Sequence, residues 1–82
     1  MRKQLWANLN SIDKAKDFAA LASLMPCEID VCSGRYVVDA KSVLGLFSVD
    51  LSVPVQVVVH GTPEEIEEFT TKCQSFLVPE ED

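Results

Sequence analysis

The sequence CEIDVCSGRYVVD, residues 27–39, decides the fold class because its apolar and polar side chains alternate. Ile29 and Val31 fall on one side of an extended chain, whereas Glu28 and Asp30 fall on the other. A period of two is typical of a strand that has one buried and one solvated face. We therefore expect a strand of an antiparallel sheet that is covered on one side only.

The same stretch contains its own return strand. Ser33 and Gly34 form a two-residue turn of the kind that closes hairpins, and residues 35–39 (RYVVD) run back from it. Two more strands are expected at residues 2–8 (RKQLWAN) and at residues 55–60 (VQVVVH), the most β-prone run in the chain.

A first amphipathic helix is predicted over residues 11–24. Asn10 or Ser11 can cap it, and Asn10 together with Asp13 fits a capping box. Pro26 ends the helix, because a proline disfavours helical conformation in the residue before it. The expected buried stripe recurs at helical spacing and comprises Ile12, Ala15, Phe18, Ala19, Ala22 and Met25.

The last helix has the clearest start. Thr62 is followed by Pro63 at the first helical position and by Glu65 at the third, which predicts a capping box. The expected buried stripe of this helix comprises Ile66, Phe69, Cys73, Phe76 and Leu77.

The order of elements, β-α-β-β-α-β-α with a short middle helix, predicts an α+β fold. Four antiparallel strands would form one sheet with the helices on one of its faces, which is an open-faced sandwich. A chain of 82 residues holds one domain. We place that domain at residues 1–78, followed by a polar tail at residues 79–82.

The charge and hydropathy of the chain argue against several classes of function. Binding to nucleic acid without sequence preference, or to an anionic membrane surface, needs clustered Lys and Arg, whereas the net charge here is −6. No window approaches the roughly 18–20 apolar residues of a membrane span. Residues 1–11 also lack the apolar run of a signal peptide, so a cytoplasmic protein is expected.

The reactive side chains form no recognisable catalytic or metal-binding motif. Cys27, Cys32 and Cys73 make no CxxC pair and have no neighbouring histidine, so we expect three reduced, buried or half-buried cysteines. His60 ends a strand, and its spacing in the sequence offers neither a nucleophile nor a carboxylate partner. We therefore predict no enzymatic activity, no cofactor and no metal.

Residues 39–47, DAKSVLGLF, are the strongest candidate for a functional surface. Ser42 stands where a strand ends and a short helix begins, so it is either a plain capping serine or a phosphorylation site. A phosphate there would meet free backbone N–H groups at the positive end of the helix dipole. Leu46 is expected to be buried, and Gly45 to let a partner's backbone come close. The expected outward, docking side chains are Val43, Leu44 and Phe47.

AKSVLGLFSVDL (residues 40–51), the hairpin CEIDVCSGRYVVDAKS (residues 27–42) and the order of elements resemble HPr, the histidine-containing phosphocarrier family of the bacterial sugar phosphotransferase system. The resemblance covers nearly the whole chain. In Gram-positive bacteria a regulatory kinase phosphorylates the family's serine before the short helix, and Ser42 matches that serine. The resemblance further implies that the short helix is a docking surface formed by Lys41, Val43, Leu44 and Phe47.

One motif of the family is missing from this chain. The phosphocarrier histidine begins the family's first helix in a His-x-Arg-Pro motif, which falls without gaps on SIDK, residues 11–14. Ser11, Asp13 and Lys14 occupy the histidine, arginine and proline positions, and the carboxylate of Asp13 would repel an incoming phosphoryl group. The resemblance therefore implies a regulatory docking module without histidine phosphocarrier activity.

The implied partners are proteins: components of the phosphotransferase system, the HPr kinase or a catabolite regulator. Neither nucleic acid nor a membrane is expected as a partner. Two alternatives stay open, namely a phosphocarrier that uses another residue and an HPr-fold module with an unrelated partner. An exposed apolar helix suits a weak homodimer as well as a monomer.

Overall fold

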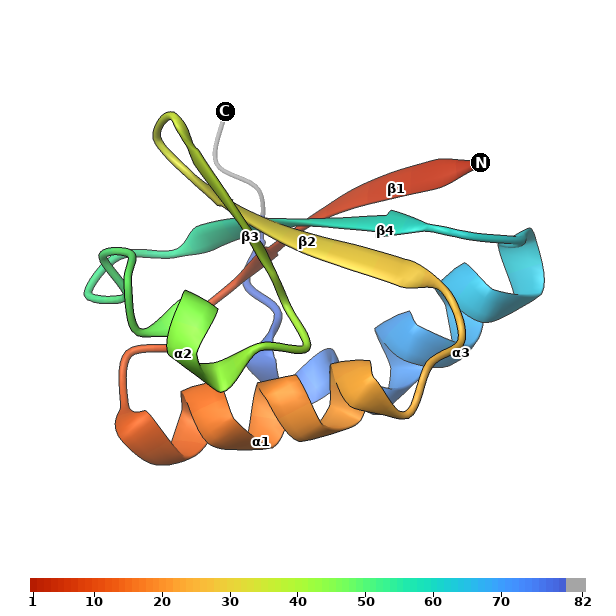
Figure 1. Ribbon diagram of the computed structural model, residues 1–82. Helices are drawn as coiled ribbons and strands as arrows, with labels where there is room; N and C mark the ends of the chain where they lie inside the picture. Colours follow the sequence, from red (N-terminus) through yellow and green to blue (C-terminus); the bar gives the residue numbers. More distant parts are fainter. Residues whose placement is uncertain (80–82) are drawn as a thin grey trace.

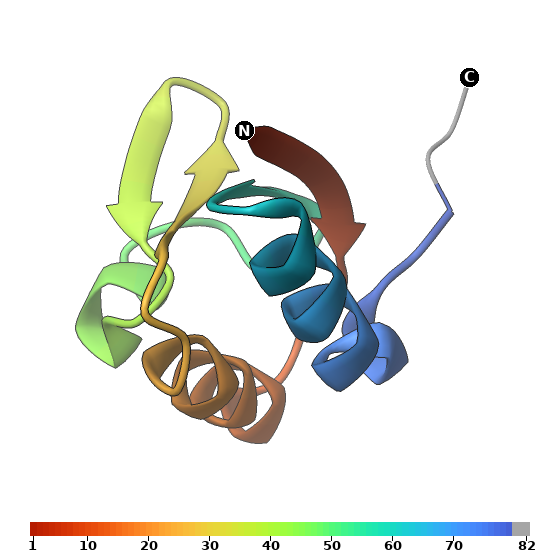
Figure 2. The same ribbon diagram turned by 90° about the vertical axis from the view of Figure 1, so that its right-hand side faces the viewer.

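The computed structural model describes residues 1–79 and shows an open-faced sandwich (Figure 1). A four-stranded antiparallel sheet forms one layer, and the helices pack on one of its faces (Figures 1 and 2). The predicted fold class and order of elements are confirmed. In chain order the elements are β1 (Arg2–Ala7), α1 (Ile12–Ser23), β2 (Glu28–Ser33), β3 (Tyr36–Asp39), α2 (Val43–Leu46), β4 (Val55–His60), α3 (Pro63–Lys72) and a 3₁₀ turn, η1 (Gln74–Phe76).

The strands lie in the order β1-β4-β2-β3, and each neighbouring pair is antiparallel. The two central strands, β4 and β2, therefore supply most of the face that the helices cover. Four alternating apolar side chains of these strands are fully buried there, in agreement with the period of two: Ile29, Val31, Val57 and Val59. The intervening side chains, among them Asp30 and His60, lie on the open face.

The β2–β3 hairpin turns one residue later than expected. Ser33 pairs with Tyr36, so the turn residues are Gly34 and Arg35, and the expected Ser33-Gly34 turn is wrong. Gly34 has a φ of 60°, which glycine adopts without the steric cost that a side chain would bring. A positive φ at the first turn position is typical of a type II′ turn, whose twist matches that of the strands.

Ser11, and not an Asn10–Asp13 box, caps α1. The Ser11 Oγ accepts a hydrogen bond from the backbone N–H of Lys14 at 3.1 Å. The Asn10 side chain accepts instead from the Lys14 ammonium at 3.2 Å. The buried stripe of α1 begins at Ala15, and the expectation that Ile12 belongs to it is wrong, because the Ile12 side chain is 69% exposed.

The capping box of α3 is confirmed, but the helix is shorter than its expected stripe. The Glu65 N–H donates to Thr62 Oγ1 at 3.1 Å, and the Thr62 N–H donates to Glu65 Oε1 at 2.9 Å. Phe76 and Leu77 lie beyond the end of α3 and are half-buried. Phe76 still packs on the core, with its ring 5.7 Å from that of Phe18 in an edge-to-face arrangement.

The segment after η1 lies along the outer edge of β1. The Asn8 N–H donates to the Phe76 carbonyl at 2.8 Å, and the Val78 N–H donates to the Trp6 carbonyl at 2.9 Å. Of the expected polar tail, Pro79 is exposed, and the rest lies outside the described residues.

Candidate functional site

α2 is a single turn of helix held by a serine cap and one buried leucine. Ser42 has an extended backbone (φ −100°, ψ 110°), and its Oγ accepts a hydrogen bond from the Gly45 N–H at 3.0 Å. The Ser42 carbonyl accepts from the Leu46 N–H at 3.0 Å. The Leu46 side chain is fully buried, as predicted. So short a helix is not stable alone. The Ser42 cap and the buried Leu46 therefore hold α2 in place and position its other side chains.

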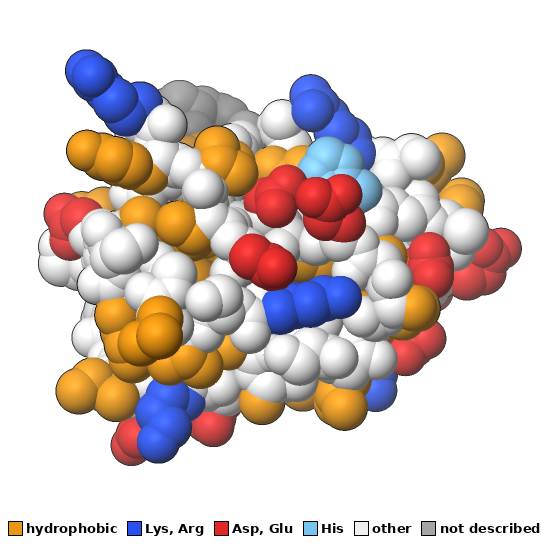
Figure 3. All heavy atoms as spheres, viewed as in Figure 1, with side chains coloured by type: hydrophobic (Ala, Val, Ile, Leu, Met, Phe, Trp, Pro, Cys, Tyr) orange, Lys and Arg blue, Asp and Glu red, His pale blue; other side chains and the backbone are white. Residues whose placement is uncertain are grey.

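Two large apolar side chains of this region point outward. Leu44 is 82% exposed and Phe47 is 44% exposed. Hydrophobic side chains gather over α2 at the lower left of Figure 3, above charged side chains over the start of α1. Val43, expected beside them, is partly buried against the core. Residues 43 and 46 are three apart and share a helix face, so the burial of Leu46 draws Val43 inward.

Gly45 serves the cap and not a partner's backbone. A Cβ atom at this position would lie 3.3 Å from Ser42 Oγ and 3.4 Å from Val38 Cβ. The missing side chain therefore faces the cap and β3, and the expected outward role of Gly45 is wrong. Its absence leaves space beside the Ser42 hydroxyl.

Lys41 ties the loop before α2 to the end of α1. Its ammonium donates a hydrogen bond to the Met25 carbonyl at 2.9 Å, and its backbone N–H donates to Asp39 Oδ1 at 2.9 Å. Part of the hydrogen-bonding capacity of the ammonium is thus used inside the protein. A docking role for Lys41 stays a prediction.

The three residues that the resemblance places at the family motif lie together in the cap and first turn of α1, the helix that contacts α2: Ser11, Asp13 and Lys14. The Ser11 hydroxyl is engaged as the cap acceptor. Asp13 is the acidic residue of the first turn, where the helix dipole favours a negative charge. The exposed Ile12 stands between them, so an apolar side chain occupies the surface at this helix start.

His60 lies at the other end of the sheet and has a carboxylate partner. Its Nε2 is 3.2 Å from Asp30 Oδ2, a contact between diagonal neighbours on β4 and β2 that sequence spacing did not reveal. Figure 3 shows the histidine among acidic side chains. His60 pairs with Arg2 at the start of β1, whereas α1 follows the end of β1. The length of a six-residue strand, about 17 Å, therefore separates His60 from the start of α1.

The cysteines were the other candidates for reactive side chains. All three cysteines are free, with Cys27 and Cys73 buried and Cys32 half-buried, as predicted. Burial raises the pKa of the Cys73 thiol to about 11, so this thiol stays protonated at neutral pH. Within residues 1–79, His, Cys, Asp and Glu do not gather in a group that could hold a metal ion. None of the helices in this part of the chain is long and apolar enough to cross a bilayer.

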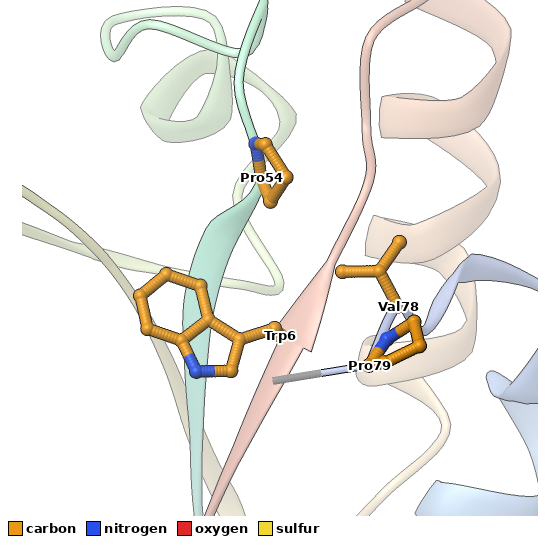
Figure 4. A pocket seen from close by; sticks show the side chains of 4 residues that line it. All are labelled: Trp6, Pro54, Val78 and Pro79. Carbon is orange, nitrogen blue, oxygen red and sulfur yellow. The ribbon is translucent and has the colours of Figure 1, made fainter. Parts of the chain in front are cut away.

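A hollow of about 520 Å³ was not anticipated from the sequence (Figure 4). It is lined by Trp6, Pro54, Val78 and Pro79. Trp6 comes from β1 and Pro54 precedes β4, while Val78 and Pro79 reach the site only because the last described segment lies along β1. None of the four lining side chains can act as an acid, a base or a nucleophile.

Comparison with solved structures identifies the fold. HPr-C-His from Thermoanaerobacter tengcongensis matches with a TM-score of 0.69 and 23% sequence identity, over 89% of this chain and 92% of that one. The histidine-containing phosphocarrier protein of Mycoplasma matches with a TM-score of 0.65 and 10% identity, over 96% and 100%. The fold is that of HPr. No family model and no curated protein matches the sequence.

The fold also determines which of the candidate residues are neighbours. It brings the start of α1 and α2, which are some thirty residues apart in the chain, to the same end of the molecule (Figure 1). α2 therefore lies beside α1, the helix whose cap and first turn contain Ser11, Asp13 and Lys14.

Proposed function

We propose that this HPr-fold protein is a regulatory, protein-docking module and not a histidine phosphocarrier. The carrying observation is the side chain of Leu44, which is 82% exposed on a helix whose fully buried side chain is Leu46. Exposed apolar side chains that gather at one place are typical of interaction sites. Leu44 and Phe47, three residues apart on one face of α2, form such a group, which we call the α2 patch.

The start of α1 supports the loss of phosphocarrier chemistry. Ser11 is used as a helix cap, and the carboxylate of Asp13 disfavours a second negative charge beside it. His60 is at the far end of the sheet and bonded to Asp30. On this proposal the partners are cytoplasmic proteins of the phosphotransferase system or of catabolite control, and the protein itself has no enzymatic activity.

The cap of α2 supports Ser42 as the regulatory residue. Its hydroxyl is only half-buried and carries one hydrogen bond, from the Gly45 N–H. The missing side chain of Gly45 leaves space around the oxygen. A phosphate there would add about −1.5 to −2 charges beside the α2 patch, without displacing a core side chain. Because α2 is the proposed docking surface, that charge would change which partners bind.

Phosphorylation is tested with purified HPr kinase, ATP and mass spectrometry of the intact protein. We expect one phosphate on the native chain, mapped to Ser42, and none on a Ser42→Ala variant. Absence of the phosphate would remove the switch but leave the docking role standing, since that role depends on Leu44 and Phe47.

The phosphocarrier alternative is tested with phosphoenolpyruvate and the first enzyme of the phosphotransferase system. We expect no acid-labile phosphoprotein, because residues 11–14 contain no histidine. A labelled product that forms in the native chain and disappears in a His60→Gln or Asp13→Asn variant would contradict the proposal.

Docking itself is tested by isothermal titration with HPr kinase and with a catabolite regulator. Leu44→Glu should abolish binding, while the thermal unfolding midpoint stays nearly unchanged. Leu24→Glu is the matched control, because Leu24 is 71% exposed at the other end of α1. Equal losses from the two variants would show that general surface charge, and not the α2 patch, governs binding.

A further inference from the structure

The outer edge of β3 carries backbone groups without a partner. β3 pairs with β2 on one side only, and the tip of their hairpin projects away from the helices (Figure 1). The Ala40 N–H donates to the Ile29 carbonyl at 2.9 Å, so the even-numbered residues of this segment face β2. In a strand the backbone groups of alternate residues point to opposite sides. Val37 therefore faces outward, and within residues 1–79 its N–H and C=O have no hydrogen-bond partner.

The side chains at this edge are apolar and exposed on both faces of the sheet. Val37 is 64% exposed on the open face, and Tyr36 is 66% exposed on the face that the helices cover. Val38 lies on the same face as Tyr36 and packs against the core. An edge strand with unpaired backbone groups and exposed apolar side chains favours pairing with another strand. The edge of β3 is therefore suited to strand addition.

The charges at the two ends of β3 lack partners of opposite sign. Asp39 lies directly opposite Asp30 across the β2–β3 pair, and like charges in this position are destabilising. Asp30 contacts His60, whereas Asp39 accepts a hydrogen bond only from the backbone N–H of Lys41. Within residues 1–79 neither Asp39 nor Arg35, the exposed residue of the hairpin turn, takes part in an ion pair. A cation beside Asp39 would relieve this repulsion.

A second copy of the chain meets these requirements in one register. If Val37 paired with Val37 of the second copy about a twofold axis, each N–H would donate to the other carbonyl. Arg35 of each copy would then lie opposite Asp39 of the other, and opposite charges across an antiparallel pair are stabilising. Tyr36 would lie opposite Val38 and cover part of its apolar surface. A twofold axis at Asp39 would instead bring two carboxylates together, which disfavours that register.

We propose that two copies of this chain associate through their β3 strands, paired antiparallel about Val37. The contact is isologous, because the same edge is used by both copies, and it joins the two four-stranded sheets into one. A strand of four residues buries less than the roughly 1,200–2,000 Å² of stable complexes. The dimer is therefore weak, and its population depends on protein concentration.

Sedimentation equilibrium and isotope-filtered NMR test the proposal on the full chain at concentrations up to about 1 mM, the range of weak complexes. We expect a monomer–dimer equilibrium and a nuclear Overhauser effect between Tyr36 Hα of one copy and Val38 Hα of the other, because Hα protons are close in non-hydrogen-bonded pairs. Within one chain these protons are about 6.6 Å apart. The Cys32–Val37 Hα contact of the hairpin serves as the internal control.

Two results would overturn the proposal. One is a monomer throughout this concentration range. The other is a dimer that shows the Cys32–Val37 contact but no contact between Tyr36 and Val38, because another surface, such as the α2 patch, would then hold the two copies together.

Charge exchange tests the register independently. Arg35→Glu should weaken dimerisation roughly tenfold, because two favourable cross-strand pairs become two unfavourable ones. Arg35→Glu combined with Asp39→Lys should restore it. Lys3→Glu is the matched control, because it makes the same change of charge at an exposed position on β1, the opposite edge of the sheet.

The outcomes separate the register from general electrostatics. Equal weakening by Arg35→Glu and Lys3→Glu would overturn the proposal, since net charge would then govern association. Failure of the double variant to restore the dimer, with its Cys32–Val37 contact intact, would overturn the pairing of residue 35 with residue 39.

Discussion

The starts of α1 and α2 are built with the same chemistry and supported very differently. Each helix begins at a serine whose Oγ accepts from the backbone N–H three residues on, at 3.1 Å for Ser11 and 3.0 Å for Ser42. α1 then continues for 12 residues with four of them buried, whereas α2 has four residues and buries only Leu46. The stability of α1 does not depend on its first turn, whereas α2 consists of a single turn.

Because of this difference, substitutions at the two helix starts should have different effects. The first turn of α1 contributes no side chain to the core before Ala15, so its residues are free to change. α2 depends on Leu46 for anchorage, yet stability makes no demand for an apolar residue at position 44. The exposed Leu44 is therefore free to serve the docking role that we propose for it.

The largest expected effect comes from the anchor of α2. Leu46→Ala should lower the free energy of unfolding by about 3 kcal/mol, because it removes a fully buried side chain and leaves a cavity. Leu44→Ala, the matched control on the same turn, should change it by less than about 0.5 kcal/mol. Urea denaturation measures both, and equal losses would mean that Leu44 belongs to the core.

The two caps give the next effect. Ser11→Ala and Ser42→Ala should each lower the free energy of unfolding by about 1 kcal/mol. The two variants should differ in how much they speed the exchange of nearby backbone amides. The Leu46 amide, bonded to the Ser42 carbonyl, should exchange faster because α2 has no second turn to hold it. The Ala15 amide, bonded to the Ser11 carbonyl, should change less. Hydrogen exchange read by NMR separates them, and the same acceleration at both amides would refute the difference in support.

Local patterns predicted the parts of this comparison that depend on near neighbours in the chain. The serine cap, the burial of Leu46 and the exposure of Leu44 follow from signals within a few residues. Helical spacing also shows which residues share a face. It does not show where a helix passes from the core to the surface, and for that reason Ile12 and Val43 exchanged their expected environments.

Local sequence patterns could not predict the contacts that depend on the order of the strands in the sheet. The His60–Asp30 pair requires β4 to lie beside β2, and the hollow at Trp6 requires residues near 78 to return to β1. Neither arrangement leaves a signal in adjacent residues. The assignment of Ser11, Asp13 and Lys14 to the positions of the family motif depends on the resemblance, and the structure adds that Ser11 caps α1.

The smallest expected effect on stability, and the one that links the two helix starts, concerns Ile12. Its side chain is 69% exposed, so Ile12→Gln should change the free energy of unfolding by less than about 0.5 kcal/mol. Glutamine is chosen because a charge in the first turn would interact with the helix dipole. If the α2 patch extends onto α1, this variant should weaken partner binding roughly three- to tenfold, within the range of single interface contacts. Leu24→Gln, at the exposed far end of the same helix, should leave binding unchanged in the same titration. Unchanged binding in both variants would confine the docking surface to Leu44 and Phe47, because α1 would then contribute only its position.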